Sequence, residues 1–126
     1  MLLALAVVVA CGEGCHRRDA KAVAVVESEL AILKPPAGIV PTEQRAGLGE
    51  MYAEGAQTYC VRDEKAGEGA LDSMLRAAGW EPVSTSSTAE ATVWHYHKGE
   101  RLGSLTLEAQ PQQCGRRFRI EVVAPL

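Results

Sequence analysis

The chain has 126 residues, with 13 Lys and Arg against 16 Asp and Glu, and a formal net charge of -3 at pH 7. Nucleic-acid-binding domains present a basic face, so this balance excludes nucleic acid as an expected partner. The length suits one modest domain with a thin core. Aromatic residues are sparse, at two Trp, three Tyr and one Phe. We therefore expect each aromatic side chain to have a structural role.

An unbroken apolar run from Leu2 to Ala10 ends at Cys11, and charged residues begin soon afterwards. The run is too short to cross a bilayer, which takes roughly 20 apolar residues. The sequence Val8-Val9-Ala10-Cys11 resembles the lipobox of bacterial lipoproteins. In that family a signal peptidase cleaves before the cysteine, and the cysteine is lipidated. The resemblance implies a signal segment over residues 1–10 and a lipidated tether over residues 11–18.

One feature departs from the family pattern, because no Lys or Arg precedes Cys11 although signal peptides open with a basic region. We therefore expect the true start codon to lie upstream. The resemblance implies a cell-envelope protein held to the membrane by acyl chains such as palmitate. Gly12 follows the cysteine where Asp would signal retention, which implies the outer membrane if the host is Gram-negative. A buried N-terminal strand or helix is the alternative interpretation of the apolar run.

The four cysteines fit this interpretation. Lipidation would use Cys11 and leave Cys15, Cys60 and Cys114. An exported chain meets an oxidising compartment. We expect Cys60 and Cys114, the two in the folded part, to form a disulfide worth about 4 kcal/mol on the chain-entropy model. Cys15 would remain as the odd cysteine beside the anchor.

The folded part is predicted to be a single domain over residues 19–126. An apolar stripe predicts a helix over residues 19–34, ended by Pro35-Pro36. Residues 37–50 hold Pro41 and three Gly, and we expect an irregular crossing with at most one short strand there. A strand is predicted over residues 57–62.

A second helix is predicted by apolar residues at i, i+3, i+4 and i+7, which are Leu71, Met74, Leu75 and Ala78. Asp63 is placed to cap its first turn. Gly79 is placed to end the helix, after which Trp80 would pack on Leu75.

The C-terminal half is predicted to be rich in strands. A strand begins at residues 80–84, and residues 85–90 form a polar turn. A hairpin over residues 92–108 turns at Gly99-Glu100, which suits a type II′ turn and sets Trp94 opposite Leu105. The last strand is predicted over residues 116–123.

These elements predict an α+β fold: a small antiparallel sheet with one main helix packed on one face, preceded by an N-terminal helix. The sequences Pro35-Pro36-Ala37-Gly38 and Gly79-Trp80, together with Tyr59, resemble small uncharacterised envelope lipoproteins. That resemblance implies no activity.

Two histidines are the main candidates for chemistry. His95 and His97 are two residues apart on a predicted strand, so both imidazoles point to one face and can hold Zn²⁺ or Cu²⁺ if a third ligand arrives. The alternative is a solvent-facing pair beside the hairpin turn.

Cys11-Gly-Glu-Gly-Cys15-His16 is one residue longer than a haem-attachment motif. No serine lies in a nucleophile elbow, and a thiol–imidazole pair with Cys60 is less expected than a disulfide.

The sequence therefore predicts a lipid-anchored envelope protein without catalytic activity or cofactor, which binds or scaffolds at a membrane surface. Its expected partners are the membrane and an envelope protein. A metal-binding or metal-trafficking protein that uses His95 and His97 is the alternative, and a hydrolase with an undetected site is a weaker one.

Overall fold

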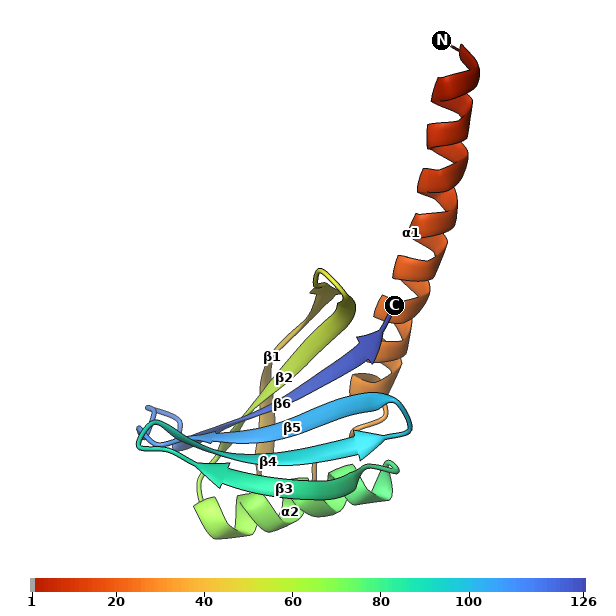
Figure 1. Cartoon of the computed structure of the whole chain (residues 1–126). Coiled ribbons are helices and arrows are strands. Elements are labelled where there is room, and N and C mark those ends of the chain that lie inside the picture. Colours follow the sequence, from red (N-terminus) through yellow and green to blue (C-terminus); the bar gives the residue numbers. More distant parts are fainter. Residues whose placement is uncertain (1) are drawn as a thin grey trace.

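A computed structural model describes the backbone of residues 2–126 and the side chains of residues 17–126. In chain order its elements are α1 (Leu2–Ala31), β1 (Ile39–Leu48), β2 (Tyr52–Val61), α2 (Glu64–Ala77), β3 (Glu81–Ser87), β4 (Ala91–Lys98), β5 (Arg101–Glu108) and β6 (Arg116–Pro125). The strands form one antiparallel sheet in the order β1-β2-β6-β5-β4-β3 (Figure 1).

Both helices cover the same face of this sheet. One cross-strand row runs through Tyr96, Gly103, Val122 and Gly55. The Tyr96 hydroxyl donates a hydrogen bond to Asp72 Oδ1 of α2 at 2.6 Å, while Gly55 lies against Val26 of α1. Side chains in one cross-strand row point to the same side. The opposite face therefore carries no helix in the part of the chain that the structure describes.

The core lies between the sheet and the two helices. Its largest fully buried side chains are Trp80, Tyr59, Tyr96 and Phe118. Gly103 makes room for Trp80, because a Cβ at Gly103 would lie 2.9 Å from the indole ring. Helix α1 contributes Ala22, Val26, Leu30 and Leu33 to the same cluster.

The ends of α2 follow the sequence prediction. Asp63 is the N-cap, and its side chain accepts a hydrogen bond from the Ala66 amide at 3.1 Å. Gly79 ends the helix with φ of 97°, a conformation that suits glycine. The Trp80 amide donates to the Leu75 carbonyl at 3.0 Å, and its side chain is buried as predicted.

A buried carboxylate ties α1 to the hairpin of β4 and β5. Glu29 Oε1 accepts from Lys98 Nζ at 3.0 Å and from Arg101 at 3.1 Å, and the Glu29 side chain is only 6% exposed. Removing both cations would leave a charge buried without a partner, which is strongly destabilising. This contact fixes α1 to the turn that joins β4 and β5, because Lys98 ends β4 and Arg101 begins β5.

The predicted disulfide is confirmed. Cys60 at the end of β2 is bonded to Cys114 in the connection before β6, 54 residues further along the chain. The hairpin register is confirmed as well, with Trp94 opposite Leu105. The disulfide closes a long loop, so it restricts the unfolded chain more than a short cross-link would.

The predicted fold class is wrong. We expected a small antiparallel sheet with one main helix on one face, preceded by an N-terminal helix. The sheet instead has six strands and carries two helices. The 64–77 helix is not the main cover, because α1 packs on β1, β2 and β6. Nor does a separate helix precede the domain, because Val26 and Leu30 are part of its core.

Two edge strands account for much of this error. Residues 37–50 were predicted to be mostly irregular but contain β1, and the predicted polar turn at residues 85–90 contains the end of β3. All of β3 is exposed, and only Ile39 is buried in β1. Strands that bury no face show no alternation of apolar residues, so their sequences resemble loops.

The packing of α2 predicts the effect of one substitution. Leu75 is 2% exposed, so Leu75→Ala should lower the free energy of unfolding by about 2–5 kcal/mol as a buried large-to-small change. Urea denaturation followed by far-ultraviolet circular dichroism measures it. Leu102→Ala is the matched control, because Leu102 is 61% exposed. Equal, small losses in both variants would contradict the packing of α2 on the sheet.

Candidate functional site

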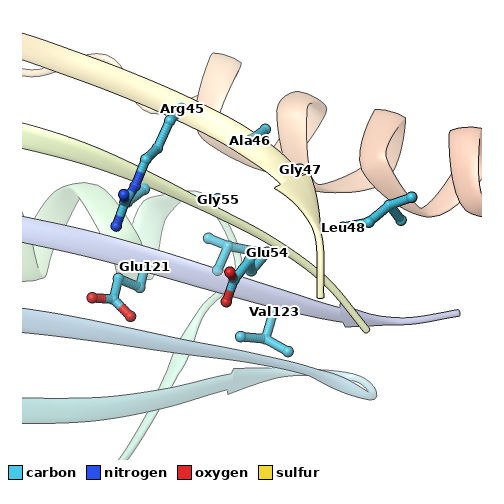
Figure 2. A pocket seen from close by; sticks show the side chains of 10 residues that line it. Arg45, Ala46, Gly47, Leu48, Glu54, Gly55, Glu121 and Val123 are labelled. Carbon is cyan, nitrogen blue, oxygen red and sulfur yellow. The ribbon is translucent and has the colours of Figure 1, made fainter. Parts of the chain in front are cut away.

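A hollow of about 220 Å³ lies over β1, β2 and β6 at the end where β1 and β6 finish (Figure 2). In Figure 2 the Arg45 side chain extends from β1 across β2, with Glu54, Glu121 and Val123 on the neighbouring strands. The hollow opens on the face of the sheet opposite α1. It is therefore the clearest concave feature on the helix-free face.

Cross-strand pairing explains why these side chains meet. Arg45, Ala56 and Glu121 occupy adjacent positions on β1, β2 and β6. The next row holds Gly47, Glu54 and Val123. Because Ala56 and Gly47 have little or no side chain, they leave space between the longer residues around them.

Charges of both signs line the hollow. Arg45 makes no ion pair with any side chain from residue 17 onwards. Glu121 is held by Arg119 at 2.6 Å on the same strand, whereas Glu54 has no such partner among those residues. One cation and one carboxylate are thus free to meet an incoming group.

A second hollow continues the first along the same face. It has a volume of about 160 Å³ and shares Arg45 and Ala56 with its neighbour. Its other walls are polar and include Arg117, which lies 3.7 Å from Glu108. The two hollows together form a trough over β1, β2 and β6 that reaches Glu108 at the end of β5, and we call it the open-face trough.

His95 and His97 lie on the same helix-free face, further across the sheet. His95 is in the cross-strand row of Arg45 and Glu121, and its side chain is exposed. His95 Nε2 lies 3.4 Å from the Ser86 hydroxyl, and His97 Nε2 lies 3.2 Å from Glu81 Oε2. Each histidine therefore contacts β3 rather than its neighbour.

Metal-ligating side chains do not converge on one another between residues 17 and 126. From the described part of the chain, no group of three or more His, Cys, Asp or Glu side chains is arranged to hold a metal ion. The side chains of Cys11, Cys15 and His16 lie outside the described residues, so the lipidation site and the haem-like motif are untested predictions. Cys60 is bonded to Cys114, so its sulfur is not a free thiol that could pair with either histidine.

Between residues 17 and 126, two groups have a clearly shifted pKa, and both belong to the core rather than to the trough. Burial raises the pKa of Tyr59 to about 12. Burial also raises the pKa of Tyr96, and its hydrogen bond to Asp72 raises it further. Both phenols lie on the helix-covered face, so they stabilise the fold and do not serve as acids or bases in the trough.

Comparisons with known proteins found no match: no family model, no curated protein and no solved structure is similar to this chain. No enzyme family or structural neighbour is therefore found for it. From residue 2 onwards, no helix is both long and apolar enough to cross a membrane.

The sequence did not predict the trough. Arg45 and Glu54 fall in or beside the segment predicted to be irregular, and their meeting depends on β1 being a strand. The small residues of β2, which are Ala53, Gly55 and Ala56, did carry one signal. Small residues in a strand indicate that another element packs closely on one face or that space is left between longer side chains on the other.

The two histidines predict a weak response to metal ions. Even catalytic zinc keeps three protein ligands, so His95 and His97 should bind Zn²⁺ or Cu²⁺ no tighter than about 1 µM. Calorimetric titration of the chelator-treated protein measures this affinity, with His95→Ala/His97→Ala as the control. Stoichiometric, tighter binding that the double variant abolishes would establish the metal-binding alternative.

Proposed function

We propose that the chain is a lipid-anchored cell-envelope protein without catalytic activity, and that it binds a protein partner through the open-face trough. The observation that carries this proposal is the unpaired Arg45 guanidinium beside Glu54 on a sheet face that no described helix covers. A free cation next to a free carboxylate suits a partner with charges of both signs.

The shape of the trough supports a protein partner over a small molecule. Small-molecule sites are deep, mostly apolar and bury most of their ligand. Both hollows of the trough are open to solvent, and charged residues line each of them, with Arg45 common to the two. A surface of this kind fits the polar rim of a protein interface, where charges set orientation and the rate of association.

The position of α1 supports the anchor. Its C-terminal half is packed in the core, and its N-terminal half runs away from the sheet toward the lipobox-like sequence that ends at Cys11 (Figure 1). The trough faces away from α1. An anchor at Cys11 would thus hold the domain at the membrane and leave the trough open.

The anchor is tested by expressing the full chain in a Gram-negative host with a basic leader added before Met1. Mass spectrometry should find an acylated N-terminal cysteine at position 11 in the membrane fraction, and two or more acyl chains are needed for stable anchoring. Cys11→Ala should abolish both acylation and membrane retention. Cys15→Ala is the matched control and should keep both, whereas an unmodified Cys11 in membrane-bound protein would refute the anchor.

A further inference from the structure

Exposed apolar residues lie at the end of the sheet where β1 turns into β2. Of the eight exposed large hydrophobic residues between positions 17 and 126, four lie there: Leu48, Met51, Tyr52 and Leu126, at 53%, 80%, 41% and 38% exposure. We call these four residues the hairpin-end surface. Isolated exposed hydrophobics need no explanation, but a cluster in one place indicates a contact surface.

Backbone pairing brings the four residues together. The Gly49 amide donates to the Tyr52 carbonyl at 2.7 Å and closes the turn between β1 and β2. Tyr52 pairs with Pro125 of β6, so Leu126 follows directly beside the turn. Pro125 in turn lines a hollow together with Val25 of α1.

The N-terminal half of α1 leaves the domain at this same end. In Figure 1 the β1–β2 turn and the C-terminus lie beside α1, on the side toward which its N-terminal half extends. Three basic residues, Arg17, Arg18 and Lys21, are exposed near the middle of the helix, and the acidic residues between Cys11 and Lys21 are Glu13 and Asp19. The path from the core to Cys11 is therefore basic on balance.

We propose that the hairpin-end surface contacts an anionic lipid bilayer, with Leu48 and Met51 reaching the headgroup region and Arg17, Arg18 and Lys21 beside anionic lipids. This proposal rests on the proposed function, because the lipid at Cys11 would bring the bilayer to this end. Apolar side chains and basic residues are the two features that hold proteins at a membrane interface.

The helix geometry sets the orientation of the domain. As a helix, the ten residues from Cys11 to Lys21 span about 15 Å at 1.5 Å per residue. Contact at Met51 therefore requires α1 to lie tilted along the bilayer, which also brings its basic residues to the headgroups. The open-face trough lies on the side of the sheet opposite α1, so it stays accessible when α1 lies on the membrane.

The test measures whether position 51 reaches lipid. The full lipidated chain carries Met51→Cys with an environment-sensitive fluorophore, in a Cys15→Ser background, and is placed in vesicles of phosphatidylcholine and phosphatidylglycerol at 3:1. Spin-labelled lipids should quench this fluorophore at least twofold. The matched control is Val83→Cys, an exposed apolar position on β3, where quenching should be negligible.

A second measurement separates surface contact from anchoring. In the unlipidated Cys11→Ala chain, Leu48→Ser/Met51→Ser should weaken binding to the same vesicles at least fivefold, whereas Val83→Ser should not. An anchored chain whose position 51 is not quenched would overturn this inference and leave the anchor intact. A chain that is never acylated at Cys11 would instead overturn the proposed function.

Discussion

The contact between α1 and the sheet at Gly55 is the constraint on which the rest of the structure depends. A Cβ at this position would lie 2.5 Å from Val26 Cγ1 and 3.1 Å from Leu30 Cδ1, so only glycine lets the helix approach this closely. Val26 and Leu30 are buried as a result. Without this contact, the inner faces of β2 and β6 would lose their cover.

The same contact links the fold to the proposed function. Helix α1 contains Cys11 in its N-terminal half, and Glu29 holds its C-terminal half to Lys98 and Arg101. A helix fixed in this way would transmit the position of the proposed anchor to the sheet. Under that proposal, the directions of the open-face trough and of the hairpin-end surface relative to the membrane would depend on how α1 packs on β2.

The sequence predicted elements whose signals are local. The α2 helix follows from its apolar spacing and from Asp63, the β4–β5 hairpin from Gly99-Glu100, and the disulfide from the position of Cys60 and Cys114. The helix and the hairpin are each encoded within a few neighbouring residues, and the disulfide by the presence of two cysteines in the folded part. The sequence pattern alone is therefore enough to predict them.

Other features depend on tertiary contacts and left no local signal. The edge strand β1 has no apolar alternation because only Ile39 is buried there, so the sequence could not predict Arg45 as part of a site. The placement of α1 against β2 depends on Gly55, a residue that in isolation indicates only a weakened strand. The number of strands and the division of the sheet between two helices followed from these contacts, which explains why the predicted fold class was wrong.

A double-mutant cycle between Gly55 and Val26 tests the central claim most directly. In an ordinary strand Gly→Ala raises stability, but here Gly55→Ala should lower the free energy of unfolding by about 1–3 kcal/mol because the new methyl group overlaps Val26. In a Val26→Ala background the same change should cost clearly less, because the 2.5 Å overlap with Val26 Cγ1 is removed and only the 3.1 Å contacts with Leu30 Cδ1 and the Arg45 carbonyl remain. A Gly55→Ala variant as stable as the unaltered chain, with no coupling to Val26, would contradict the account.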